Sequence, residues 1–196
     1  MTKRAKNYEK PLAVKEGTEW SDLIAMSLKA QPEKKLPKNL IFLDIDGVLN
    51  CQLFYDTKPK KTIYEPSDNI DPVRVGWLNE LCDETDSAVV ISSTWRMSGL
   101  EYCTKVLREA GATFTILDIT PRLHIARGCE IDQWLRDNCM IHFGVHGHDF
   151  YRYAIIDDDS DMLLNQEPHF FHTDNYSGLT PNTCYRIKRF FTHKTF

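Results

Sequence analysis

Two aspartates separated by a single residue directly follow a short apolar run. The run covers residues 39–43, and Asp44, Asp46 and Gly47 come after it. If the run is a buried strand, an extended backbone points both carboxylates the same way, and the glycine permits a sharp turn after them. One carboxylate can then attack an electrophile while its neighbour moves a proton. The pattern therefore predicts covalent and acid–base chemistry at the end of this strand.

Acidic and hydroxyl side chains also follow four later apolar runs. The segments at these run ends are Ser92–Arg96, Asp118–Thr120, Asp157–Asp161 and Thr173–Asp174. So many carboxylates cannot converge unpaired, because like charges and burial both disfavour the ionised form. A divalent cation resolves that conflict, and oxygen ligands of this kind suit Mg²⁺.

The elements that must position these residues alternate along the chain. Predicted strands cover residues 39–43, 88–91, 113–117, 153–156 and 169–173. Helical patterns lie between them and after the last one, and the first begins at the favourable pair Asp71-Pro72. Such alternation predicts an α/β fold, a Rossmann-like three-layer sandwich with a central parallel sheet of about five strands. Ligands of these sheets bind beyond the carboxyl ends of the strands.

The motifs themselves resemble those of the haloacid dehalogenase (HAD) superfamily of phosphohydrolases. Residues 43–50, Leu-Asp-Ile-Asp-Gly-Val-Leu-Asn, are similar to the first family motif, and Ile91-Ser92 is similar to the second. Arg127 lies where the family has its third-motif Lys or Arg. Residues 155–158, with Asp161 after them, match the acidic fourth motif.

A closer resemblance is to the HAD domains of multidomain RNA-repair ("Swiss Army knife") proteins and their stand-alone phage and bacterial relatives. The segments that carry it are residues 93–96, 127–131, 156–159, 173–174 and 178–180. The resemblance covers roughly residues 40–181, so residues 1–38 lie outside it.

The resemblance implies a role for each motif residue. Asp44 would be the nucleophile that forms an aspartyl-phosphate, and Asp46 the general acid and then the base that activates water. Ser92 would hydrogen-bond a phosphoryl oxygen, and Arg127 would supply a fixed positive charge. Arg122 competes with Arg127 for that role.

Mg²⁺ is the cofactor that the resemblance implies. Asp44, the backbone carbonyl of Asp46 and acids of the fourth motif would hold it, and we favour Asp157 and Asp158 among those acids. Two further acids could be ligands instead, or could cap the next helix: Asp159 and Asp161.

Three residues complete the expected substrate-binding set: Gly47, Ser93 and Arg96. A shift of one residue would exchange Ser93 with Ser92. Arg96 either touches substrate or pairs with one of the acids.

The spacing of the motifs leaves little room for a cap domain. The gaps at residues 50–87 and 97–126 are short, so we expect a minimal cap or none, and an open site that favours large substrates. The loop at residues 52–64 mixes aromatic residues with lysines, which could stack a base and hold a phosphate backbone, or could pack on the body. We expect a Mg²⁺-dependent phosphatase of nucleotides or nucleic-acid terminal phosphates. The alternatives are a phosphatase of phosphoproteins or small metabolites, and an inactive binding module.

Composition agrees with this picture. The chain has 196 residues and a net charge of −4, which divides into +4 over residues 1–38 and −8 over residues 39–196. We expect a basic extension, with a short helix over residues 19–30 and a linker, before a HAD-like catalytic domain at residues 39–196. Neither a secretory leader nor a membrane span is expected, which favours a cytoplasmic protein with six reduced cysteines. Three histidines at positions 142, 146 and 148 are interpreted as a loop without a metal role.

Overall fold

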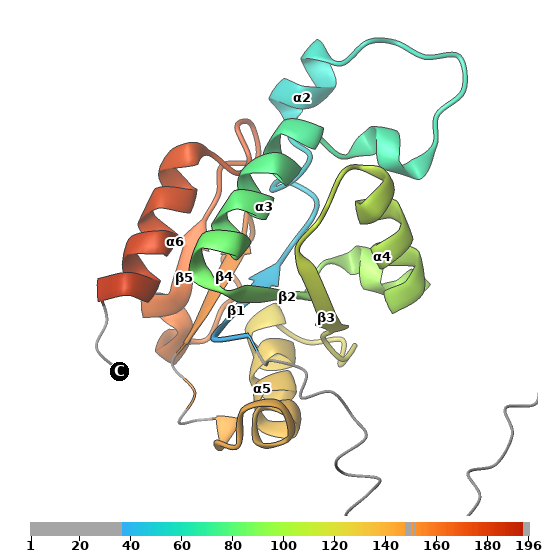
Figure 1. Ribbon diagram of the computed structural model, residues 1–196. Coiled ribbons are helices and arrows are strands. Elements are labelled where there is room, and N and C mark those ends of the chain that lie inside the picture. The colour runs from blue at the N-terminus through green and yellow to red at the C-terminus, as the bar shows by residue number, and fades with distance from the viewer. Residues whose placement is uncertain (1–36, 148–149, 151, 194–196) are drawn as a thin grey trace, which may run out of the picture. The chain divides into compact units, whose positions relative to one another are not determined.

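A computed structural model of the chain describes residues 37–147, 150 and 152–193 (Figure 1). Five parallel strands form one sheet in the order β3-β2-β1-β4-β5. They are β1 (Asn39–Leu43), β2 (Ser87–Ile91), β3 (Thr115–Ile119), β4 (Tyr153–Asp157) and β5 (Phe170–His172). The helices are α2 (Gln52–Thr57), α3 (Pro72–Thr85), α4 (Leu100–Glu109), α5 (Arg127–Phe143) and α6 (Pro181–His193). Three 3₁₀ helices are η1 (Pro66–Asn69), η2 (Thr94–Ser98) and η4 (Leu164–His169). The helix expected over residues 19–30 lies outside the described residues.

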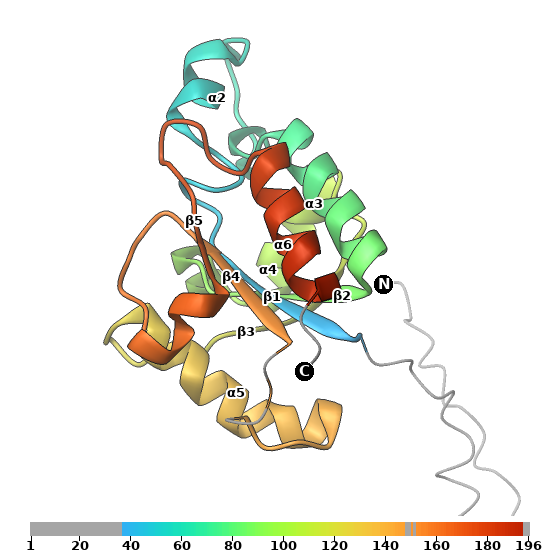
Figure 2. The same cartoon turned by 90° about the vertical axis from the view of Figure 1, so that its left-hand side faces the viewer.

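Alternating side chains of β1 explain why helices cover both faces of the sheet. Leu40 and Phe42 belong to a buried cluster with Trp134 of α5. Ile41 and Leu43 belong to a second cluster with residues of α3, α4 and α6. Figure 2 shows α5 on one side of the sheet and α3 and α6 on the other. The predicted α/β sandwich with a five-stranded parallel sheet is therefore confirmed.

The start of α3 follows the expected capping chemistry. The Asp71 carboxylate accepts a hydrogen bond from the amide of Val73 at 2.9 Å, and Pro72 is the first helical residue. Asp71 also forms a buried ion pair with Arg74, whose Nε donates to the carbonyl of Ser177 at 3.1 Å. The pair thus ties α3 to the segment that precedes α6.

Strand β3 begins and ends two residues later than the 113–117 predicted. Phe114 is 2% exposed and packs into the core before the strand starts, so the apolar run includes a residue that is not part of the strand. Asp118 consequently lies inside the strand, where it accepts a hydrogen bond from the Trp134 indole at 2.8 Å. Thr120, rather than Asp118, follows the end of β3.

Helix α5 extends five residues beyond the end predicted at residue 138. The loop interpretation is therefore wrong for His142, which lies in the helix with its ring stacked on Trp134 at a centroid distance of 6.1 Å. Ring stacking against the buried indole favours the longer helix. His148 lies outside the described residues.

The segment after β1 also differs from the predicted loop, because it contains helices α2 and η1. The amides of Gln52 and Leu53 donate to the carbonyls of Asn175 and Tyr176 at 3.1 and 3.0 Å. A distant loop therefore satisfies two of the free amides at the start of α2, a contact that no local pattern reveals. At the other end of α2, the ammonium group of Lys58 lies near three aromatic rings: Phe54, Tyr55 and Tyr64.

The expectation of little or no cap agrees with the elements between the motifs. The first gap holds only α2, η1 and α3, and the second holds η2, α4 and β3, and none of these described residues forms a separate domain. No helix in the described ranges is long and apolar enough to cross a bilayer. All six cysteines are free thiols.

Candidate active site

The sheet aligns the first site residues by extending its hydrogen bonds one residue past the strands. The amide of Asp44 donates to the carbonyl of Ile156 at 3.0 Å, and that of Ser92 donates to Leu43 at 2.9 Å. Asp157 is the last residue of β4. Every second residue of these strands faces α5, and Asp44, Ser92 and Asp157 each lie two residues after one that does. Their side chains therefore project toward α5, which begins at Arg127.

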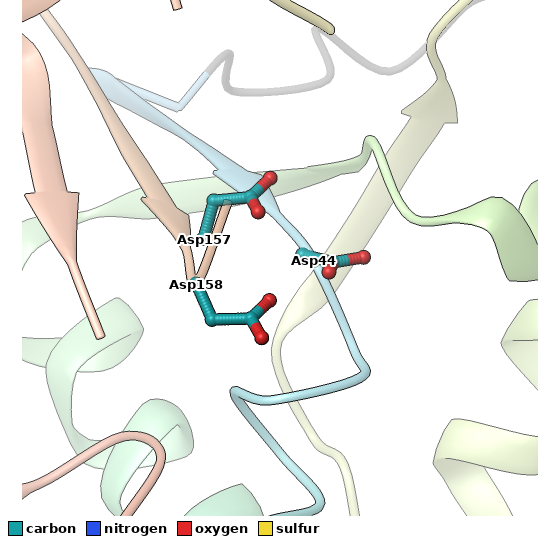
Figure 3. Close-up of side chains that lie close together, drawn as sticks. All are labelled: Asp44, Asp157 and Asp158. Atoms are coloured by element: carbon teal, nitrogen blue, oxygen red, sulfur yellow. The ribbon is translucent and has the colours of Figure 1, made fainter. Parts of the chain in front are cut away.

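Three carboxylates converge at these strand ends. One oxygen from each of Asp44, Asp157 and Asp158 lies within 4.8 Å of the others (Figure 3). Asp44 is 4% exposed and Asp157 is fully buried, whereas Asp158 is half-buried. The pair favoured from the sequence, Asp157 and Asp158, is thus the pair that meets Asp44. The acid at position 161 faces the start of α5 instead.

This crowding changes the acidity of the cluster. Burial, reinforced by the charge of Asp44, raises the pKa of Asp157 far above the usual carboxyl range. The same two causes raise the pKa of Asp158. Ionised carboxylates at this separation therefore need a positive partner.

Arg127 is that partner among the described residues. Its Nη1 lies 2.9 Å from Oδ1 of Asp44 and 3.1 Å from Oδ2 of Asp157, and it donates to the carbonyl of Ser92 at 3.1 Å. Burial disfavours the charged guanidinium, but attraction to the two aspartates outweighs burial, and the pKa of Arg127 is raised. The competing candidate, Arg122, is exposed in the loop before α5.

The position of Arg127 is fixed by the chain that follows β4. Its amide donates to the Asp161 carboxylate at 2.8 Å, and Gln166 donates to the carbonyl of Gly128 at 2.8 Å. A Cβ on Gly128 would lie 2.5 Å from the amide nitrogen of Leu163, so only glycine allows this approach. Asp161 therefore satisfies a free amide at the start of α5, a helix that precedes it in the chain, and not at the next helix, for which the sequence had raised a capping role.

The segment after β2 places two serines and an arginine beside the cluster. The Ser92 hydroxyl is buried and has no hydrogen-bond partner within the described structure, whereas the Ser93 hydroxyl accepts from the amide of Trp95 at 3.4 Å. Arg96 pairs with Glu130 and donates to the carbonyls of Ser92 and Ser93 at 2.6 and 2.7 Å. Of the two alternatives for Arg96, the structure therefore shows the ion pair with an acid, and a contact with substrate stays a prediction.

Asp46 lies apart from the three-carboxylate cluster. It is exposed, and its two oxygens accept from Nδ2 of Asn50 at 2.8 Å and from Nε1 of Trp95 at 2.9 Å. Gly47 adopts a φ of +67° in the turn, and a Cβ there would lie 2.1 Å from Oδ2 of Asp158. Gly47 is thus required both by the turn and by the neighbouring carboxylate.

Sequence reasoning gave no role to two residues that hold the site together. Asn50, 2% exposed, donates to Asp46 and accepts from the amide of Gly47 at 3.0 Å. Glu130, 4% exposed, pairs with Arg96. Glu130 lies four residues before Trp134 and so on the inward face of the predicted helix, a signal that could have identified it, because a charge on that face requires a partner.

The donor set fits a small divalent cation. Carboxylate oxygens are the preferred ligands of Mg²⁺ and Ca²⁺, and their mutual distances match a shared ion with bonds of about 2.0–2.6 Å. Three ionised carboxylates and one guanidinium leave two negative charges, which one divalent ion would balance. Oδ2 of Asp157 is also buried, and within the described residues it accepts no hydrogen bond, although Nη1 of Arg127 lies 3.1 Å from it.

Comparison with curated proteins and with solved structures found no match. A family model, described as the HAD domain in Swiss Army Knife RNA repair proteins, matches residues 40–184, which are 145 of the 196 residues. The match includes every motif residue discussed above and all of the strands except the first residue of β1, and the family indicates a metal-using phosphohydrolase. The chain therefore belongs to the HAD domain family of Swiss Army Knife RNA repair proteins.

Proposed function

We propose that the protein is a Mg²⁺-dependent phosphohydrolase that cleaves phosphate monoesters through a covalent phosphate on Asp44. The observation that carries this proposal is the arrangement around Asp44, where two further carboxylates and the Arg127 guanidinium meet beside Ser92, whose hydroxyl has no hydrogen-bond partner among the described residues. Acids alone would repel a phosphate. A site that combines them with a fixed cation and room for a divalent ion favours phosphate chemistry instead.

Asp44, Asp157 and Asp158 would hold the metal. Bound there, Mg²⁺ would neutralise charge between the attacking carboxylate and the phosphate. Arg127 would contribute fixed positive charge to the same group, and the Ser92 hydroxyl would donate a hydrogen bond to a phosphoryl oxygen.

The reaction then proceeds in two displacements. An oxygen of Asp44 attacks phosphorus, the bond between phosphorus and the leaving oxygen breaks, and Asp46 donates its proton to that oxygen. A water molecule next attacks the same phosphorus, and Asp46 takes the proton of the water. The bond between Asp44 and phosphorus breaks, which returns both carboxyl groups to their starting states and releases phosphate.

Nucleotides or the terminal phosphates of nucleic acids are the substrates that we favour. The matched family is described from RNA repair proteins, and the described segments between the motifs add no cap domain over the site. Phosphoproteins and small metabolites are alternatives that use the same chemistry. An inactive binding module is disfavoured because both Asp44 and Asp46 are present.

A substrate panel tests this proposal. It comprises oligonucleotides with a 3′- or 5′-terminal phosphate, nucleoside monophosphates, phosphopeptides and sugar phosphates, each assayed with Mg²⁺ and with EDTA. We expect Mg²⁺-dependent release of phosphate that is fastest from a nucleotide or an oligonucleotide end. Faster turnover of phosphopeptides or sugar phosphates would contradict the substrate class, and no turnover of any member would contradict the activity.

A further inference from the structure

Trp95 makes a polar contact that its place in the sequence does not suggest. Its indole Nε1 donates to Oδ2 of Asp46 at 2.9 Å, across 49 positions of the chain. The rest of the ring packs against the core cluster that lies under α3 and α4. Apolar packing of this half-buried ring therefore helps to position the donor.

The segment that carries Trp95 is itself anchored to the site. Ser93 caps η2 through the amide of Trp95, and Arg96 fastens the same segment to α5 through Glu130. Arg96 also donates to the carbonyl of Ser92. The indole N–H is thus held in a fixed relation to the end of β2, where the phosphate-binding hydroxyl is proposed.

The second oxygen of Asp46 is held by Asn50, which belongs to the same turn as Asp46. The Asn50 amide donates to Oδ1 of Asp46 at 2.8 Å, while its carbonyl oxygen accepts from the amide of Gly47 at 3.0 Å. Each carboxylate oxygen of Asp46 therefore receives one hydrogen bond from the described residues, and the donor is neutral in each case. A carboxylate oxygen can accept two hydrogen bonds, so each keeps one free lone pair.

We propose that Trp95 is a positioning residue for proton transfer by Asp46. This inference rests on the proposed function. By holding one oxygen, the indole fixes the direction of the free lone pair that carries the proton. The proton moves from Asp46 to the leaving oxygen in the first displacement and returns to Asp46 from water in the second, while both hydrogen bonds persist. A neutral donor suits this task, since it holds the carboxyl group in both protonation states without an ion pair.

The dependence of rate on the leaving group tests this proposal. Protonation matters most for a poor leaving group, and kcat/KM reports the steps up to its departure. Trp95→Phe keeps an aromatic ring that can pack on the core and removes the N–H donor. We expect kcat/KM to fall roughly ten- to a hundredfold for phenyl phosphate, and less than about threefold for 4-nitrophenyl phosphate.

Trp134→Phe is the matched control. The Trp134 indole also donates to an aspartate, Asp118 at 2.8 Å, but in the contact between α5 and β3. We expect this variant to lower kcat/KM equally for both esters, if at all. Thermal unfolding and far-UV circular dichroism establish that each variant is folded.

A double variant separates positioning from packing. If Trp95 acts through Asp46, adding Trp95→Phe to Asp46→Asn should change kcat/KM by less than about threefold for either ester. Unchanged kinetics in the single variant, an equal loss for both esters, or full additivity in the double variant would each overturn the proposal. An inactive wild-type protein would instead contradict the proposed function, so the two failures are distinguishable.

Discussion

Asp44 and Asp46 are separated by one residue, and their carboxylates meet different surroundings. Asp44 is buried among two other carboxylates and contacts the Arg127 guanidinium. Asp46 is exposed and receives hydrogen bonds from two neutral groups, on Asn50 and Trp95. One short motif therefore supplies a strongly charged site and a weakly charged one.

The difference matches what the two proposed roles require. A nucleophile must remain ionised beside a phosphate, which needs cations and exclusion of water. A proton carrier must change its charge twice in each turnover, which strong ion pairs would resist. Variants that change one set of surroundings at a time therefore test whether the two act separately.

The largest effect is expected for Asp44→Asn, with Asp46→Asn as its counterpart. Loss of the nucleophile should lower kcat by at least about a thousandfold for every ester. Loss of the proton carrier should cost about a hundredfold or more with phenyl phosphate and clearly less with 4-nitrophenyl phosphate. Steady-state kinetics with both esters check this, and equal losses in the two variants would remove the distinction between the surroundings.

The stability of the metal-free protein should depend on pH through Asp157, a carboxyl group beside Asp44. Burial, together with the charge of Asp44, raises the pKa of Asp157 to about 8. Between about pH 4 and pH 8 the native state therefore binds a proton that the unfolded chain has released. The stability that this bound proton contributes is fully present at low pH and is lost as pH rises through that window.

Urea unfolding in EDTA at pH 5 and pH 8 measures this contribution. We expect the wild-type protein to lose stability between the two values and Asp157→Asn to lose less. Added Mg²⁺ should stabilise the wild-type protein more at pH 8 than at pH 5, because it binds the ionised carboxylates. A steeper pH dependence in the variant than in the wild type would contradict the assigned sign.

The smallest effect is expected for Asp161→Ala. The Asp161 carboxylate accepts from the first amide of α5, so its loss should lower the free energy of unfolding by about 1 kcal/mol. The gain in stability on adding Mg²⁺ should persist, whereas Asp158→Ala should abolish it. Thermal unfolding with and without Mg²⁺ distinguishes the two, and loss of the Mg²⁺ effect in Asp161→Ala would make that residue a ligand.

The strand ends of the site were predictable because they follow from local patterns. Apolar runs identify the strands, and parallel strands bring Asp44, Ser92 and Asp157 to one edge of the sheet. The resemblance then directed attention to Arg127, which contacts all three.

The contacts that fix side-chain directions were not predictable in the same way. The Trp95–Asp46 hydrogen bond spans 49 positions and the Arg96–Glu130 ion pair spans 34. They depend on how helices and turns pack on the finished sheet, which no local period encodes. Helix α2 was missed for a similar reason, because a distant loop satisfies its first amides.

Covalent phosphorylation of Asp44 is the step on which the proposed mechanism depends. Rapid acid quench during turnover, followed by peptide mass spectrometry, detects the residue that carries the phosphoryl group. We expect one added phosphoryl group on the peptide that contains Asp44, removed by hydroxylamine and absent from Asp44→Asn. Sustained turnover by Asp44→Asn, or a phosphoryl group trapped on a different residue, would contradict it.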